Sequence, residues 1–172
     1  MACVPDASPL IILSKIERVE LLPRLYGQVL VTPWVWDEAV VKGKAMGAAD
    51  AAYLEGTTRE LRFTTVRLTS TENALAERLM TEGRIHWGEA GILSVAKQRK
   101  AIAILDEKEA RTVAVGMGVA HIGTVGVVYE AFLHKLVSYD ELIEFLEKVS
   151  KVAWVSPDLV ARIIRQASEV RK

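Results

Sequence analysis

Four acidic residues occupy positions where carboxylates could act together on a metal ion. Asp6 follows a short apolar segment in VPDASPL, and Asp106 follows one in AIAILDEK. Glu38 and Glu89 lie in the first turns of two predicted helices, within TPWVWDEAV and HWGEAGI. Carboxylates that converge repel one another and raise one another's pKa unless a cation neutralises them. Oxygen ligands of this kind suit Mg²⁺ or Mn²⁺, which can activate water for phosphodiester hydrolysis.

The four carboxylates can converge only if the segments before them belong to one parallel sheet. Segments 2–4 and 101–105 are apolar and end close to Asp6 and Asp106, which predicts two buried strands. A third strand, predicted at 29–31, leads into the helix that carries Glu38. Ligands of an open parallel sheet gather at the carboxyl ends of its strands. The sequence therefore predicts one acidic crevice at this edge of the sheet.

Strands alternate with helices along the whole chain. This order predicts a three-layer α/β/α fold with a central parallel sheet and a helical C-terminal segment. We expect one domain over residues 1–172, with a core over about 1–136 and C-terminal helices over about 138–170. The remaining strands are predicted at 63–68 and 119–122, and helices at 9–16, 18–26, 33–43, 45–54, 70–80, 87–100, 107–115, 124–136, 139–149 and 158–170.

Each acid also has an ordinary structural interpretation. Acidic residues in the first turn complement the helix dipole, so each of the four could be a cap or a solvated charge. Ser8 and Pro9 form an N-cap and first-turn pair, which leaves Asp6 without a capping role. Asp37 is an alternative to Glu38, but it points about 100° away around the helix. The common location of the four acids at one sheet edge favours a shared site.

Five segments, in this order, resemble the PIN-domain superfamily: DASPLI, VTPWVWDEAV, GEAGILSVAK, AIAILDEKEARTVA and HIGTVGVV. Within it, the chain is similar to a prokaryotic branch related to VapC-type toxins, over about residues 3–136. The resemblance implies a metal-dependent ribonuclease whose four acids, matching Asp6, Glu38, Glu89 and Asp106, hold Mg²⁺ or Mn²⁺. The chain departs from the family at the third acid, where many PIN domains have aspartate, and in EKEAR after Asp106.

Three further residues are candidates for substrate binding. Ser8 matches a position where PIN domains often place a hydroxyl near the metal. Arg111 could contact a scissile phosphate, or it could lie on the surface or between helices. Thr124 follows a glycine at a strand-to-helix turn, where it could contact a phosphate or a metal-bound water, or cap the next helix.

The composition limits the class of protein. Lys+Arg and Asp+Glu both number 22, and this balance argues against a broadly basic nucleic-acid coat while permitting a local basic groove. Trp34, Trp36 and Trp87 lie close in sequence to Glu38 and Glu89, where they could stack on nucleobases or be buried.

Several features favour a cytoplasmic protein. Cys3 is the only cysteine, so no intramolecular disulfide can form, and no secretory signal opens the chain. The uncharged stretch 112–129 approaches membrane-spanning length, but four glycines interrupt it, so we expect no membrane association.

The sequence therefore predicts a Mg²⁺- or Mn²⁺-dependent endoribonuclease that acts on RNA. The toxin of a toxin–antitoxin pair is a further hypothesis, with an antitoxin protein as partner. PIN relatives commonly dimerise, so the resemblance implies a homodimer, for which the apolar helices 9–22 and 139–149 offer surfaces. Two alternatives stay open: a non-catalytic PIN-like module that binds nucleic acid or protein, and a metal-dependent phosphatase for small phosphoesters.

Overall fold

The computed structural model describes residues 1–61, 63–83 and 85–171, and within them it has a sheet of five parallel strands in the order β3-β2-β1-β4-β5. The strands are β1 (Ala2–Pro5), β2 (Gln28–Val31), β3 (Thr64–Thr65), β4 (Ile102–Ile104) and β5 (His121–Ile122). The last three residues of β1 and of β2 are buried, a pattern typical of parallel strands covered on both faces. The predicted central parallel sheet is confirmed.

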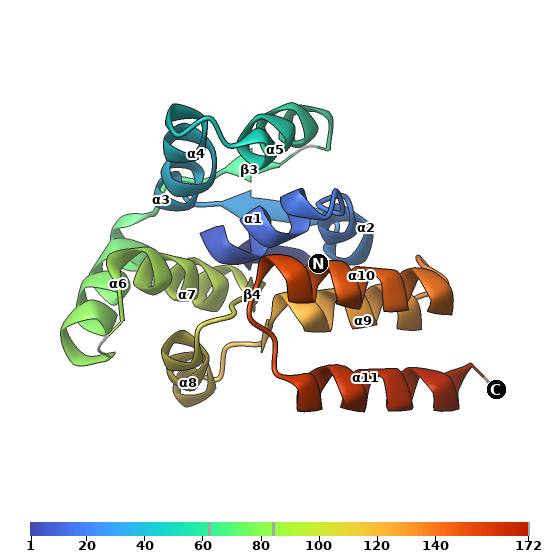
Figure 1. Ribbon diagram of the computed structural model, residues 1–172. Coiled ribbons are helices and arrows are strands. Elements are labelled where there is room, and N and C mark those ends of the chain that lie inside the picture. Colours follow the sequence, from blue (N-terminus) through green and yellow to red (C-terminus); the bar gives the residue numbers. More distant parts are fainter. Residues whose placement is uncertain (62, 84, 172) are drawn as a thin grey trace.

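Helices cover both faces of this sheet (Figure 1). They are α1 (Ala7–Lys15), α2 (Leu21–Tyr26), α3 (Pro33–Trp36), the π-helix η1 (Asp37–Lys42), α4 (Gly43–Ala45), α5 (Ala49–Glu60), α6 (Ser70–Gly83), α7 (Trp87–Arg99), α8 (Lys108–Met117), α9 (Thr124–Leu133), α10 (Tyr139–Val152) and α11 (Pro157–Val170). In Figure 1, α6, α7 and α8 lie on one side of the strands, and α9, α10 and α11 lie on the other. The predicted three-layer arrangement with a helical C-terminal segment is confirmed.

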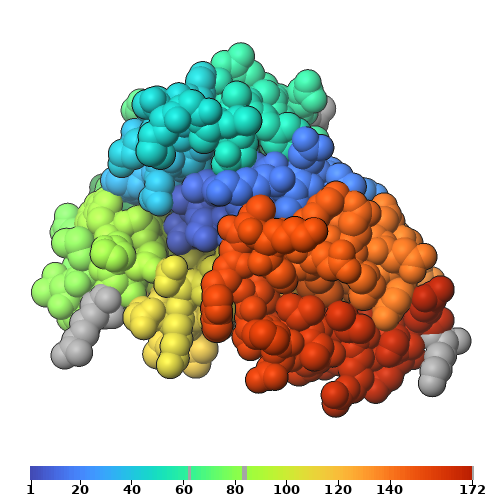
Figure 2. Space-filling view, in the orientation of Figure 1, coloured from blue at the N-terminus to red at the C-terminus, as the bar shows by residue number. Residues whose placement is uncertain are grey.

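Helix α1 is largely buried in the fold, where it contacts α5, α9 and α10. Its residues Leu10 and Leu13 are fully buried, and so are Leu142 and Phe145 of α10. Figure 2 shows the N-terminal segment between the region of α4 and α5 and the C-terminal helices. The prediction that helices 9–22 and 139–149 offer their apolar faces to a dimer is therefore wrong, because these faces form the core of one chain. The homodimer itself stays a prediction.

The strand order reverses next to β1. The chain first places β2 and β3 on one side of β1, and then returns to place β4 on the other side. Such a reversal opens a crevice at the carboxyl ends of the strands, where ligands of open α/β sheets bind. The backbone N–H of Asp6 donates to the carbonyl of Ile104 at 3.0 Å, so Asp6 lies at this crevice. Asp106 follows β4 and lies at the same edge.

Three predicted elements differ from the structure. The helix predicted at 45–54 begins later, at Ala49, and continues to Glu60 as α5. The strand predicted at 63–68 comprises only Thr64–Thr65, which are exposed at the edge of the sheet. The helix predicted at 33–43 is not a regular α-helix, because α3 continues into the π-helix η1 before α4 begins. A π-helix has hydrogen bonds between residues five apart and is frequent at functional sites. Here it carries Glu38.

No helix in the described parts of the chain is long and apolar enough to cross a membrane. The uncharged stretch 112–129 is divided among α8, β5 and α9. Gly118 ends α8 with a φ of 63°, in the left-handed region that glycine adopts without a steric penalty.

Candidate active site

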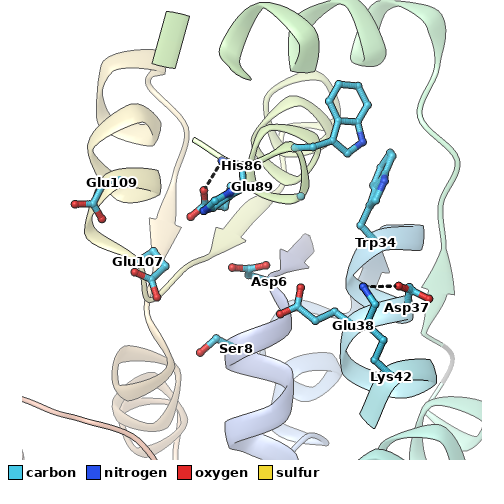
Figure 3. Close-up of a pocket in the computed structure, with 12 residues that line it drawn as sticks. Asp6, Ser8, Trp34, Asp37, Glu38, Lys42, His86, Glu89, Glu107 and Glu109 are labelled. Atoms are coloured by element: carbon cyan, nitrogen blue, oxygen red, sulfur yellow. Dashed lines mark hydrogen bonds and ion pairs between the residues drawn. The ribbon is translucent and has the colours of Figure 1, made fainter. Parts of the chain in front are cut away.

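A cleft of about 840 Å³ opens at the carboxyl end of β1. In Figure 3, Asp6 lies at its centre, the carboxylate of Glu38 points toward Asp6, and His86 and Glu89 lie across from Glu38. Three of the four predicted acids therefore line one cleft. The complete lining consists of Asp6, Ser8, Trp34, Asp37, Glu38, Lys42, His86, Trp87, Gly88, Glu89, Glu107 and Glu109.

Asp6 is the N-cap of α1, so the prediction that Ser8 caps this helix is wrong. The Oδ1 atom of Asp6 accepts a hydrogen bond from the backbone N–H of Ala7 at 2.8 Å. Ser8 and Pro9 are the second and third residues of the helix, where proline is tolerated because the first N–H groups have no intrahelical partner. Ser8 lines the cleft below Asp6 in Figure 3, and its contact with a metal or a substrate stays a prediction.

The carboxyl group of Asp6 has a pKa of about 6, raised from 3.8. The largest cause is burial, which disfavours the charged form. The hydrogen bond from Ala7 lowers the pKa, whereas the negative charges of Glu89, Glu38 and Asp106 raise it. All three other predicted acids thus lie close enough to Asp6 to act on its charge. We call Asp6, Glu38, Glu89 and Asp106 the acidic cluster.

Glu89 is held in place by the start of α7. Its Oε2 atom accepts a hydrogen bond of 2.9 Å from the backbone N–H of His86, the residue before the helix. A glutamate at the third helical position commonly makes this contact, as one half of a capping box. The interpretation of the acids as helix caps is thus correct for Asp6 and Glu89. Their capping hydrogen bonds also hold both carboxylates in the cleft. Among the described residues, capping uses one oxygen of each carboxylate and leaves the other for a ligand.

Glu38 reaches the cleft from the π-helix. Its neighbour Asp37 pairs instead with Lys42, with 2.9 Å between Oδ2 and Nζ. Residues five apart lie about 140° apart around an α-helix, so this pair would not form on one. The i→i+5 geometry of η1 brings Asp37 and Lys42 to the same side. The π-helix therefore pairs Asp37 with Lys42 and leaves Glu38 to face Asp6.

Asp106 is fixed by Thr124, the first residue of α9. The N–H of Thr124 donates to Oδ1 at 2.8 Å, and its hydroxyl donates to Oδ2 at 2.6 Å. Because Thr124 is 1% exposed, we assign it a positioning role in place of the predicted substrate contact. The alternative cap role is wrong, since Gly123 is the N-cap of α9. Asp106 is absent from the lining of the cleft described here, yet its charge raises the pKa of Asp6.

Arg111 belongs to α8, and its guanidinium lies near Asp106 and Gly123, at the turn from β5 into α9. A Cβ atom built on Gly123 would lie 3.0 Å from Oδ1 of Asp106 and 3.6 Å from Nη1 of Arg111. Glycine at this position therefore leaves room for both groups. Within the described residues, Arg111 forms no ion pair, so its charge is available to an anion. Its contact with a scissile phosphate stays a prediction.

The donor set of the acidic cluster fits a hard divalent cation. All four groups are carboxylates, and like charges this close are stabilised by a cation. Across residues 1–61, 63–83 and 85–171, no three His, Cys, Asp or Glu side chains are arranged as ligands of one ion. Asp6, Glu89 and Asp106 are held by hydrogen bonds, whereas Glu38 is exposed and free to change its rotamer. The residues that would hold an ion are Asp6, Glu38, Glu89 and Asp106.

The cleft contains residues to which sequence reasoning assigned no role. Glu107 and Glu109 line it, and their position just after Asp106 could have indicated this. Lys42 also lines it, but its approach depends on the π-helix, which the sequence does not reveal. Trp34 and Trp87 line the cleft, as their spacing from Glu38 and Glu89 permitted.

The comparison with known families agrees with this fold. The family model DUF3368, described as a PIN domain, matches residues 2–169. The match spans nearly the whole chain, so the protein belongs to this PIN-domain family. PIN domains are generally nucleases, which are hydrolases, and usually use divalent metal ions. A comparison with curated proteins gives no match. The resemblance to the PIN-domain superfamily is confirmed, and the closer relation to VapC-type toxins stays a prediction.

Proposed function

We propose that the protein is an endoribonuclease that hydrolyses RNA phosphodiester bonds with Mg²⁺ or Mn²⁺ held by the acidic cluster. The observation that carries this proposal is the convergence of four carboxylates at the crevice beside β1. They come from the ends of two neighbouring strands and the starts of two helices, and Glu38, Glu89 and Asp106 all act on the charge of Asp6. In a PIN-domain family, such a cluster is best explained as the nuclease centre.

The electrostatics of the cleft support a role for a cation. Asp6 becomes charged only against burial and three like charges. These repulsions are relieved when a divalent cation neutralises the cluster, so ion binding and deprotonation of Asp6 favour each other. RNA, which is itself an anion, is repelled by the acidic cluster alone. Neutralisation of the cluster therefore comes before substrate binding.

Each residue of the cluster has a defined task in the proposed reaction. A divalent ion held by the cluster would supply a water of lowered pKa and would stabilise negative charge on the phosphate. Asp6 and Glu89 are oriented by the helix caps they form, and Asp106 is oriented by Thr124. Exposed Glu38 is the carboxylate best able to adjust its position. Arg111, next to Asp106, is the proposed contact for the phosphate.

Cleavage of single-stranded RNA in Mg²⁺ or Mn²⁺, with and without EDTA, tests this function. Asp6→Asn keeps an N-cap residue but removes the charge, and we expect it to reduce cleavage by about 100-fold or more. Asp106→Asn is expected to act similarly. Glu109→Gln is the matched control, because it removes a carboxylate that lines the same cleft but does not act on Asp6. It is expected to change the rate little.

Activity that survives both Asp6→Asn and Asp106→Asn would contradict the site. RNA binding without cleavage in either metal would favour the non-catalytic module, and turnover of small phosphoesters alone would favour the phosphatase. The toxin role needs a separate experiment. Expression of the wild type should arrest growth of its host, and expression of Asp6→Asn should not.

A further inference from the structure

Two tryptophans form an aromatic wall of the cleft, which we define as Trp34 and Trp87. Their ring centroids lie 5.4 Å apart, and the ring planes meet at 79°, an edge-to-face contact. Both side chains are partly exposed and line the same cleft as Asp6 and Glu89. Trp36 and Trp87 both pack against the hydrophobic core, but Trp36 is absent from the lining of the cleft. Part of the aromatic surface of Trp34 and Trp87 is thus accessible beside the acidic cluster.

The wall is built into the fold through two glycines of α7. A Cβ atom on Gly91 would lie 3.3 Å from Cζ3 of Trp34, so the ring of Trp34 rests where α7 has no side chain. A Cβ atom on Gly88 would meet nothing within 4 Å, so the cleft is open next to Trp87. The ring of Trp34 therefore packs against α7, and the aromatic wall faces the open cleft.

Lys42 adds a cation near this wall. It belongs to the same continuous helical segment as Trp34, and both line the cleft (Figure 3). Among the described lining residues it is the only lysine or arginine. Its partner Asp37 is half exposed, and ion pairs between exposed groups are weak. Lys42 can therefore leave Asp37 for an incoming phosphate.

Resting on the proposed nuclease function, we propose that the aromatic wall stacks one unpaired nucleobase of the substrate and that Lys42 contacts a phosphate of the same strand. A nucleobase is neutral, so it can occupy this part of the cleft without the repulsion that a phosphate would meet. The scissile phosphate then lies toward the acidic cluster. Stacking depends on the π-face that every base has, so the subsite selects for single strands more than for sequence.

Binding of a labelled single-stranded oligoadenylate with phosphorothioate linkages, measured by fluorescence anisotropy in Mg²⁺, tests the subsite. Trp34→Ala is expected to weaken binding about 10- to 100-fold, as for removal of a stacking platform. Trp34→Phe keeps an aromatic face and should lose much less, which separates stacking from a folding defect. Trp154→Ala is the matched control, because Trp154 is 89% exposed and lies outside the cleft lining, and it should bind like the wild type.

Lys42→Ala is expected to weaken binding less and to reduce the slope of log Kd against log salt by about 0.7, the value for one phosphate contact on a single strand. The same strand annealed to its complement should bind more weakly than the single strand, because its bases are already stacked and paired. Thermal unfolding of each variant shows whether it is folded at the assay temperature.

Equal affinity of Trp34→Ala and Trp154→Ala, equal binding of single strand and duplex, or no binding to the wild type would overturn the subsite. Tryptophan-dependent binding of an oligoarginine peptide in place of RNA would also overturn it, since the wall would then receive a cationic side chain. The cleavage assay decides the nuclease function independently. RNA cleavage with binding that does not depend on Trp34 would contradict only the proposed subsite. RNA binding that depends on Trp34, without cleavage, would contradict only the proposed nuclease function.

Discussion

Two largely buried carboxylates of this protein have opposite surroundings. Glu72, at the start of α6, accepts hydrogen bonds from Nε of Arg99 at 2.7 Å and from the backbone N–H of Thr69 at 2.7 Å. The bond from Arg99 is the largest cause of its lowered pKa. Asp6 has one backbone hydrogen bond and three acidic neighbours, and its pKa is raised to about 6.

The difference separates a structural carboxylate from a functional one. The charge of Glu72 is neutralised within the chain, where it joins α6 to α7. The charge of Asp6 is not neutralised by any described residue, so its ionised form needs a cation from outside. A buried charge with its partner supports the fold, whereas carboxylates gathered without a partner are typical of an active site.

Removing the partner of Glu72 should have the largest effect on stability. Arg99→Met leaves the Glu72 carboxylate buried without its counter-charge, and we expect a loss of about 3–5 kcal/mol in the free energy of unfolding. Urea denaturation measures this loss. Arg59→Met is the matched control, since Arg59 pairs with Glu55 at the surface, and its effect should be far smaller. Similar losses in both variants would contradict the structural role of Glu72.

Removing the charge of Asp6 should act in the opposite direction. The folded pKa of about 6 exceeds the ordinary 3.8, so the folded state holds the proton more tightly and its stability falls as pH rises from about 4 to 6. Asn carries no charge, so Asp6→Asn should be more stable than the wild type at pH 7 by up to about 3 kcal/mol. The gain should disappear at pH 4. A stability loss at pH 7 in EDTA would contradict this account.

The pH dependence of Glu72→Gln should have the reverse sign. The folded pKa of Glu72 lies below 4.5, so its charge contributes stability above that pH, and this contribution is lost as pH falls through the folded pKa. We expect Glu72→Gln to lose about 1–3 kcal/mol at pH 7, as for a hydrogen bond to a charged group. Thermal melts from pH 7 down to 3 should show the difference from wild type shrinking. A difference that grows on acidification would contradict the assigned partners.

Thr124 should affect activity more than the fold. Thr124→Val removes the hydroxyl that donates to Oδ2 of Asp106 but keeps the shape of the side chain. We expect cleavage to fall about 10- to 100-fold, as for loss of a group that orients a metal ligand. Thr124→Ser keeps the hydroxyl and should retain most of the rate. Full activity of Thr124→Val would contradict the assignment of Thr124 as the residue that positions Asp106.

The parallel sheet and the acids at its edge were predictable because alternating strands and helices allow few other arrangements. The role of Asp6 as the N-cap of α1 was not predictable. Asp6 and Ser8 are both good N-cap residues, and Pro9 is compatible with a helix that begins after either of them. The π-helix was also hidden, because it inserts extra length without a sequence signal and alone brings Lys42 to Asp37. The bond between Thr124 and Asp106 joins residues 18 apart and required the folded chain.

Isothermal titration calorimetry with Mn²⁺ near pH 6 tests most directly whether the acidic cluster is a metal site. The wild type is expected to bind Mn²⁺ and to release protons, because binding deprotonates Asp6. Asp6→Asn should bind Mn²⁺ at least about tenfold more weakly than the wild type. Loss of a group that only supports a ligand already weakens metal binding about tenfold or more, and loss of a ligand should cost at least as much. Glu109→Gln should bind like the wild type. Equal Mn²⁺ affinity of the wild type and Asp6→Asn would contradict the account.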